Sequence, residues 1–499
     1  MTKQRHYDRL SAQDNSFLLY ESGNVRMHIA SCNILDIGPL QTDNGGIDID
    51  LVKRATESFL PLVPRYRQRI YQIPAFKHAV WVDDPHFDLD YHVRHTALPQ
   101  PGTLSQLKNL VARVMAQPLD RRRPLWETWF VEGLGGGDQF AMISKIHHCM
   151  IDGVSGIDIA QIQFSTSPSP PELKEPERFR PRPAPRRLEL FLDESRRTAG
   201  TPFEILHDLR QFVHSTEDLR EEVETRVSAL THLVGMGLSS DETPLNGRVG
   251  PHRRFEWLAC RLNDLKAMRK GLGSSINDVV LTIVTGAVRE YLLAKGVDLE
   301  AIDFKVSTPV SVRRAGDEGQ LGNHVSSWII RLPIQEPDPR LQLETIHELT
   351  ESLKRTNQAI GVQMINQIQE WTPSTLLSLG AQAMSGPINT IVTNVPGPQV
   401  PLYFHGARVR AIYPSAALME GMGIGIALTS YAGTMGIGFN FDPDIVRDIG
   451  LFLARFRQSI EKVAAAAEVE IGPVSDDVNE VQDTRRMRGE EPGGQRESS

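Results

Sequence analysis

Apolar residues recur at helical spacing in two segments of the first third of the chain. In residues 50–60 (DLVKRATESFL) and 104–116 (LSQLKNLVARVMA) they return every three or four positions, as on one face of an α-helix. Residues 139–148 (QFAMISKIHH) are short, apolar and β-prone, and they follow a Gly135–Gly137 run that is typical of a turn. We therefore expect two helices and a largely buried strand here.

The second half of the chain again mixes segments with helical spacing and short β-prone segments. We expect strands at 305–312, 326–333, 390–395, 423–431 and 435–441. We expect helices at 275–295, 341–359 and 443–466. The pattern predicts an α/β (α+β) protein with two mixed halves.

Composition changes abruptly between the halves. Seven prolines lie between 168 and 185, and because proline blocks helix this stretch should be an extended, exposed connector. Residues 188–237 then read as amphipathic helix, expected to pack on the protein; a membrane-surface role would need a more basic polar face. The predicted layout is an N-terminal lobe (1–165), a crossover linker (166–250), a C-terminal lobe (251–472) and a disordered tail (473–499).

Charge and cysteine content narrow the class of protein. The 499 residues carry 54 basic and 62 acidic side chains, a net charge of −8, which argues against a nucleic-acid partner. No apolar run is long enough for a membrane span, and the N-terminus lacks the apolar region of a signal peptide. Three scattered cysteines suggest no disulfide framework. A cytoplasmic protein with a full core is expected.

Candidate chemistry concentrates where the strand at 139–148 ends, in His147-His148-Cys149-Met150-Ile151-Asp152-Gly153. Successive strand side chains face opposite ways, so one histidine should face the interior and the other should be free to do chemistry. An imidazole is a natural general base for an alcohol. Asp152 would fix the following loop, and Gly153 would allow a sharp turn before the helix expected at 154–164.

Three other interpretations of this segment stay open. The histidines could be a buried polar pair without a catalytic role. A metal site built from His147, His148 and Asp152 is disfavoured by the opposed strand faces and by the lack of a further His/Cys cluster. Cys149 could be imagined as a nucleophile, but it lacks an activating signature, and a buried cysteine is usually inert.

The same residues resemble a known motif. His147-His148-x-x-x-Asp152-Gly153 is similar to the HHxxxDG motif of the bacterial wax ester synthase/acyl-CoA:diacylglycerol acyltransferase family. Further segments resemble motifs of that family in its order, from about residue 10 to about 465. They are Pro124-Leu125-Trp126 (PLW), Asn277-Asp278 (ND), Thr308-Pro309-Val310-Ser311-Val312-Arg313 with Leu321-Gly322-Asn323 (PVS-R and GN), and Asn394-Val395-Pro396-Gly397-Pro398 (NVPGP).

The N-terminus also resembles the family's opening segment, D..F...E...PMH. The matching residues are Asp14, Phe17, Glu21 and Met27-His28. Arg26 replaces the usual proline, a change that does not touch the acyl-transfer motif.

The resemblance implies a fold of two chloramphenicol-acetyltransferase-like lobes, with a substrate channel between them and the histidine at its midpoint. Acyl-CoA would enter as co-substrate, with no metal and no further cofactor. The acceptor would be diacylglycerol or a long-chain alcohol. Contact with the inner face of the membrane or with lipid droplets would be peripheral.

The resemblance and the local patterns together suggest a role for each residue. His148 is the expected base, His147 is structural or accessory, and Asp152 supports the loop with Arg313 as its candidate partner. Asn277 is a candidate oxyanion donor. Other motif residues have structural interpretations: Ser275-x-x-Asp278 is a capping pattern, Leu125 and Trp126 after Pro124 are core anchors, and Asn394 begins a turn.

Other functions remain open on the sequence alone. The same fold could acylate a different acceptor, or the chain could be a catalytically silent lipid-binding protein, although its histidine motif is intact. A metal-dependent hydrolase is the weakest alternative.

Overall fold

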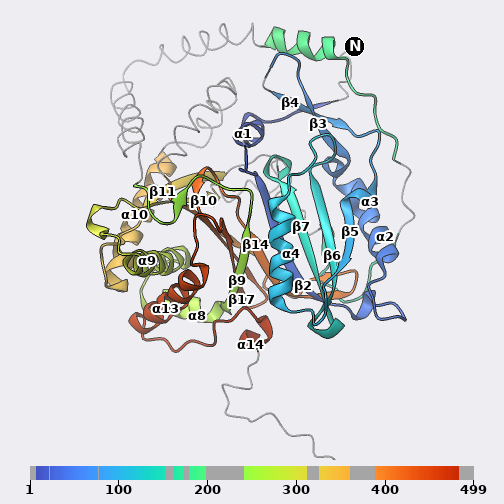
Figure 1. The fold of residues 1–499 in the computed structure, drawn as a ribbon. Helices are drawn as coiled ribbons and strands as arrows, with labels where there is room; N and C mark the ends of the chain where they lie inside the picture. Colours follow the sequence, from blue (N-terminus) through green and yellow to red (C-terminus); the bar gives the residue numbers. More distant parts are fainter. Residues whose placement is uncertain are drawn as a thin grey trace, which may run out of the picture.

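The computed structural model describes residues 7–21, 23–76, 78–151, 162–173, 179–197, 241–311, 325–359 and 388–482. Two six-stranded mixed sheets dominate this part of the chain and lie side by side (Figure 1). Each sheet is the centre of its own apolar core. The predicted α/β class and two-lobed arrangement are confirmed.

The first sheet holds the histidine strand near its middle. In spatial order its strands are β13 (Tyr403–Phe404), β14 (Ala407–Ser415), β2 (His28–Asp36), β7 (Gln139–His147), β6 (Trp126–Leu134) and β5 (Val93–Ala97). Only the β5–β6 pair is parallel. The helices of the same lobe include α2 (Ile49–Phe59), α3 (Leu89–His92) and α4 (Leu104–Ala116). Helix α4 begins with a capping box formed by Thr103 and Gln106.

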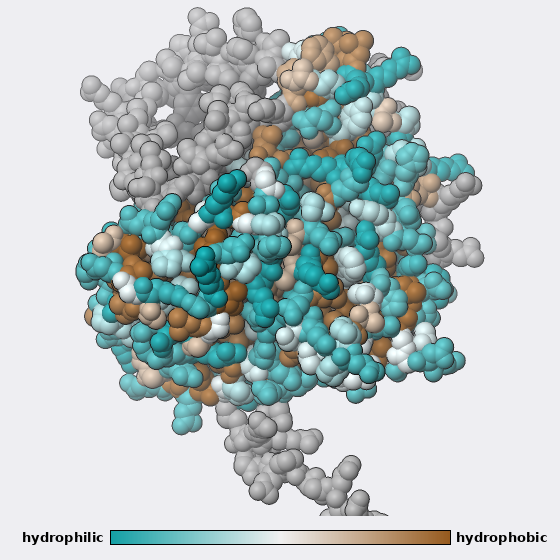
Figure 2. All heavy atoms as spheres, viewed as in Figure 1, coloured by the Kyte–Doolittle hydropathy of each residue, from teal (hydrophilic) through white to brown (hydrophobic). Residues whose placement is uncertain are grey.

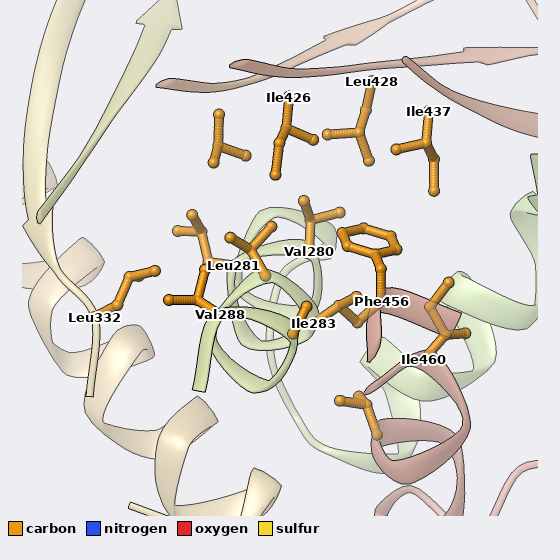
Figure 3. Packing of buried hydrophobic residues seen from close by; sticks show 14 of the residues in the cluster. Val280, Leu281, Ile283, Val288, Leu332, Ile426, Leu428, Ile437, Phe456 and Ile460 are labelled. Atoms are coloured by element: carbon orange, nitrogen blue, oxygen red, sulfur yellow. The ribbon is translucent and has the colours of Figure 1, made fainter. Parts of the chain in front are cut away.

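The second sheet packs against a layer of helices. Its strands, in spatial order, are β11 (Val325–Arg331), β10 (Lys305–Ser311), β12 (Thr390–Pro396), β16 (Ile424–Tyr431), β17 (Thr434–Phe441) and β9 (Arg254–Arg261). The helices are α8 (Leu262–Gly271), α9 (Ile276–Ala294), α10 (Pro339–Ala359) and α13 (Ile449–Ala466). Figure 3 shows Val280 of α9 facing Ile426 and Leu428 of the sheet, with Phe456 of α13 beside it. Helix α9 is therefore the centre of this core.

Smaller elements complete the described chain. β1 (Asp8–Arg9), β4 (Ala79–Asp83) and β3 (Gln68–Gln72) form a three-stranded sheet, and β8 (Asn246–Gly247) pairs with β15 (Gly421–Met422). Helix α1 (Ala12–Tyr20) begins at Ser11, whose side chain accepts the backbone N–H of Asp14. No single described helix is long and apolar enough to cross a bilayer; α8 and α9 pass such a test only as a pair bent by 95°.

Two segments pack differently from what the predicted layout suggests. Strand β14 falls within the predicted C-terminal lobe, yet it pairs with β2 and extends the first sheet. Residues 474–482, predicted to be tail, instead pack on the protein: α14 (Val478–Gln482) buries Val478 and Val481, and Ser475 forms a β-bridge to Ala259. These two apolar side chains hold the otherwise polar segment together with polar contacts, such as the bond from Nε1 of Trp257 to the Asp476 carbonyl at 2.9 Å.

Most of the predicted elements are confirmed to within about two residues. One is not: the helix expected from residue 443 begins at Ile449, because Asp442 organises a turn in which it accepts the backbone N–H groups of Asp444 and Val446. Residues 166–173 and 179–186 of the connector carry no regular secondary structure and are mostly exposed, as predicted. The predictions for 154–164, 198–237 and 483–499 lie wholly or mostly outside the described residues.

The two lobes meet where β14 crosses β17 at very short range. A Cβ atom on Gly438 would lie 1.8 Å from the carbonyl oxygen of Pro414, and one on Gly436 would lie 2.1 Å from that of Ile412. Beside this crossing, Trp257 of β9 stacks on Tyr413 of β14 with ring centroids 4.8 Å apart. The absence of a side chain at these glycines lets the lobes close on each other.

We expect Gly438→Ala to destabilise the protein by about 3 kcal/mol or more, because the rigid Pro414 carbonyl must move to admit a methyl group. Thermal unfolding measures this loss. Gly450→Ala in α13 is the matched control, because a Cβ there meets nothing within 4 Å. Equal melting temperatures for the two variants would contradict the close-contact argument.

Candidate active site

Backbone hydrogen bonds fix both histidines at the end of β7. His147 lies opposite His28 in the β2–β7 pairing, and its N–H donates to the carbonyl of Leu125 at 2.9 Å. The N–H of His148 donates to the carbonyl of Met27 at 2.8 Å. The PLW segment and the Met27-His28 segment therefore position one histidine each.

The His147 side chain faces the interior and is almost fully buried. Its Nδ1 accepts the backbone N–H of Cys149 at 3.1 Å, so a neutral ring carries its proton on Nε2. That Nε2 lies 3.6 Å from Oε1 of Glu21. His147 thus has a structural environment, as the strand alternation predicted.

His148 leaves the strand and begins a 3-10 turn (His148–Ile151). Its ring packs on Phe17 of α1 with centroids 3.9 Å apart, and it is only partly buried by its neighbours. Burial, and then the nearby His147, lower the pKa of His148 from 6.5 to about 4. The ring is therefore neutral near pH 7 and able to accept a proton, although its pKa lies well below the near-neutral value that suits a general base best.

Glu21 connects the helix α1 region to the histidines. Its Oε1 accepts the N–H of Met27 at 3.1 Å and lies 3.4 Å from Nε2 of His28. Its Oε2 accepts from Arg121 at 2.7 Å. Burial alone would raise the pKa of Glu21, but His147, His28 and Arg121 outweigh it and hold that pKa far below its usual range. The carboxylate stays charged and ties together the backbone that positions His148.

The PLW residues, which precede strand β6 or begin it, are packed into the core beside the histidines. Leu125 and Trp126 are buried, and the Trp126 ring stacks between Tyr66 and His92. Its Nε1 donates to the Tyr66 carbonyl at 2.8 Å. Pro124 adds a carbonyl that accepts the Trp126 N–H at 3.0 Å. These contacts agree with the predicted role as core anchors.

The ND residues divide into two roles. Asp278 and Ser275 form the predicted capping box, with backbone-to-side-chain distances of 3.0 and 3.1 Å. Burial raises the pKa of Asp278, but bonds from His347 and Thr350 of α10, each at 2.9 Å, and from Ser275 bring it below its usual value. Asp278 therefore holds α9 and α10 together and has a structural environment.

Asn277 faces a different partner. Its Oδ1 accepts from Nδ2 of Asn394 at 2.7 Å, which joins the ND segment to the NVPGP strand β12. With its oxygen engaged in this way, the Asn277 amide keeps its Nδ2 as a donor. The two segments, 117 residues apart in sequence, meet through this bond.

Several predicted residues lie outside the described part of the chain: Asp152, Gly153, Arg313, Leu321, Gly322 and Asn323. Cys149 is described; it is buried, and burial raises the pKa of its thiol well above 9. It therefore lacks the thiolate character that a nucleophile needs. No three His, Cys, Asp or Glu side chains among the described residues are placed to hold a metal ion, so the metal interpretation gains no support.

Sequence reasoning did not assign roles to four side chains that complete these contacts: His28, Arg121, His347 and Thr350. The spacing of Phe17 and Glu21, four residues apart, was a usable signal, because it places both on one face of a helix end. The partners of Asp278 on α10 had no local signal.

Comparison with known proteins shows which family the chain belongs to. The model of the wax ester synthase/diacylglycerol acyltransferase catalytic domain matches residues 10–280, and that of the WS/DGAT C-terminal domain matches residues 321–464. The chain belongs to the wax ester synthase/diacylglycerol acyltransferase family. A WS/DGAT relative from Mycobacterium tuberculosis, named "Probable diacyglycerol O-acyltransferase tgs2", is 30% identical, and the match covers 93% of this chain and 100% of the relative.

Solved structures share the fold. The wax ester synthase/diacylglycerol acyltransferase from Marinobacter aquaeolei VT8 matches with a TM-score of 0.62 at 22% identity, covering 92% of this chain and 100% of that one. A starter condensation domain of rhizomide synthetase, in complex with C8-CoA and Leu-SNAC, matches with a TM-score of 0.56 at 14% identity, covering 96% and 97%. The WS/DGAT chain therefore has the fold that the resemblance implied.

We expect Glu21→Gln to reduce both stability and activity. The amide carries no charge to balance Arg121, and loss of a hydrogen bond to a charged group costs about 2 kcal/mol. Thermal unfolding and acyl-transfer rates measure the two effects. Glu300→Gln, on an exposed turn, is the control. Unchanged stability in Glu21→Gln would contradict the role of this carboxylate.

Proposed function

We propose that this chain is an O-acyltransferase that moves a fatty acyl group from acyl-CoA to the hydroxyl of diacylglycerol, a long-chain alcohol, or both. The observation that carries the proposal is the position of His148 at the end of a buried strand, held by Met27 and Phe17 within an intact family motif. Triacylglycerol or wax ester would be the product.

In the proposed reaction His148 accepts the proton of the acceptor hydroxyl. The hydroxyl oxygen attacks the thioester carbonyl and forms a C–O bond, and the carbonyl π electrons move to oxygen. The tetrahedral intermediate then expels the CoA sulfur as the C–S bond breaks. The proton on His148 passes to that sulfur, so CoA leaves as a thiol and the ring is neutral again.

The oxyanion of the intermediate needs hydrogen-bond donors, each typically worth about 3 kcal/mol. Asn277 is the candidate among the described residues, since its bond from Asn394 leaves an N–H₂ group to donate. His147 would serve the site indirectly, through the chain turn that its Nδ1 stabilises. Asp152 and Arg313, for which the family motif is the only support, would order the loop beyond His148.

Apolar neighbours would limit hydrolysis. Phe17 covers the His148 ring, and Cys149 and Met150 behind it are fully buried in the first core. Water that reached the base would compete with the alcohol for the thioester. The local environment thus favours transfer to an acceptor that brings its own apolar chain.

The substrates and setting are part of the proposal. Acyl-CoA as donor is supported by the C8-CoA complex of the condensation-domain neighbour, and diacylglycerol as acceptor by the names of the mycobacterial relatives. No further cofactor is proposed. We infer a cytoplasmic enzyme in peripheral contact with the inner face of the membrane or with lipid droplets, where both lipid substrates and products reside.

We expect His148→Ala to lower acyl transfer about 100-fold or more with either hexadecanol or diacylglycerol, the usual contribution of a general base. Release of CoA from palmitoyl-CoA measures it. His252→Ala, at an exposed site, is the control. A wild-type rate in His148→Ala would remove the base assignment. No CoA release by the wild type with any alcohol, despite lipid binding, would favour a silent lipid-binding protein.

The pH dependence of kcat/KM tests the environment of His148. The base works when neutral, so the rate falls as pH drops through its folded pKa, at about 4 rather than near 6.5. The unfolded state, with the higher pKa, binds the proton first, so stability falls once the pH drops below about 6.5. Short assays with an unfolding control separate the two effects. An acid limb centred near pH 6.5 in folded protein would contradict the desolvated base.

A further inference from the structure

One helix of the crossover carries its apolar face outward. Residues 187–197 are helical, and Leu188, Phe191 and Leu192 are exposed by 67%, 38% and 42%. Their spacing of three and four residues places them on one side of the helix. In Figure 1 this is the green helix at the top of the molecule, and Figure 2 shows a brown apolar patch at the same place.

The opposite side of this helix holds it to the protein, largely through acids. Asp193 accepts from the hydroxyl of Tyr7 at 2.8 Å, and Glu194 forms a two-pronged ion pair with Arg9 of β1. Leu190 is buried, in one cluster with Ile73, Val80 and Val82 of the three-stranded sheet region. An ordinary surface helix buries its apolar stripe and exposes its charges. Here the acids are engaged and most of the apolar stripe remains exposed.

The surroundings of the patch are basic. Arg186 and Arg187, at the start of the helix, are exposed, and no ion pair joins their guanidinium groups to any described residue. Arg196 and Arg197, at its end, are exposed by 78% and 55% and lie 3.8 and 3.9 Å from Asp193 and Glu194. The chain as a whole carries a net charge of −8. A local concentration of arginines beside exposed leucines and phenylalanine matches an anionic lipid surface in both charge and polarity.

The patch is physically linked to the active site. Ser11, two residues after Arg9, caps α1, and Phe17 of α1 rests on His148. Phe76, at the β3–β4 turn, extends the apolar surface, with its ring 5.9 Å from that of Phe191. A short rigid path, from residues 7 to 17, therefore separates this helix from the catalytic histidine.

We propose that the helix at 187–197 docks this enzyme on anionic phospholipid membranes. Leu188, Phe191 and Leu192 enter the headgroup region, and the arginines at 186 and 187 contact lipid phosphates. The choice of partner rests on the proposed function, since the acceptor is a lipid that resides in the membrane. The docking itself requires no catalysis.

Flotation of the full-length protein with vesicles tests the proposal. We expect binding to mixed phosphatidylcholine and phosphatidylglycerol vesicles, weaker binding to phosphatidylcholine alone, and weakening by salt. The variant Leu188→Ser/Phe191→Ser/Leu192→Ser should bind mixed vesicles at least about tenfold less, because three apolar side chains no longer enter the lipid. Arg186→Glu/Arg187→Glu should lose the preference for anionic vesicles.

The matched control is Leu62→Ser/Leu293→Ser/Leu341→Ser, three similarly exposed leucines elsewhere on the chain, which should bind as wild type. Wild-type binding by the patch variant, or no vesicle binding by the wild-type protein, would overturn the proposal. So would a patch variant that only abolishes self-association in sedimentation. Turnover with a short water-soluble alcohol should be unchanged in the patch variant; loss of turnover in wild type would instead count against the proposed function.

Discussion

The buried carboxylate of Glu21 is the interaction on which the site depends most. It reaches the N–H of Met27, the imidazoles of His28 and His147, and the guanidinium of Arg121. Met27 in turn holds the backbone of His148. A buried charge without such partners would be costly to keep ionised. Glu21 ends α1, and its partners come from the start of β2, the end of β7 and the segment before β6, so one charge holds these elements in a single arrangement.

A second constraint sets the relation of the two lobes. Strand β14 belongs by sequence to the C-terminal half but completes the N-terminal sheet, and the bare glycines of β17 let its backbone approach closely. Lys108 of α4 adds a bond to Glu256 at 2.9 Å and to Asp476 at 2.6 Å, across the same junction. Strand β14 therefore joins the two lobes, because it pairs with one sheet and packs closely against the other. This junction fixes the position of the two lobes relative to each other.

The local features of this fold could be predicted from the sequence, and the long-range ones could not. The apolar run before the histidines predicted the strand that ends at His147, and Ser275-x-x-Asp278 identified a helix start, because both signals lie within a few residues. The contact of Glu21 with His147 spans 126 positions, and the pairing of β14 with β2 joins residues from opposite ends of the chain. The helix at 187–197 shows a third limit: periodicity predicts an apolar face but does not say whether the protein or something outside it covers that face.

The low pKa of His148 makes sense as part of the proposed reaction. An imidazole with such a low pKa is a weak base toward an alcohol alone. Negative charge that develops on the attacking oxygen and the oxyanion favours the protonated ring, and it is present only while the acyl group is being transferred. The site therefore disfavours the protonated His148 ring strongly before the reaction and less strongly in the transition state. It also makes the protonated ring a strong acid, so the proton passes readily to the departing sulfur. A histidine packed against Phe17, with a pKa of about 4, is suited to carry a proton briefly and to hold none between turnovers.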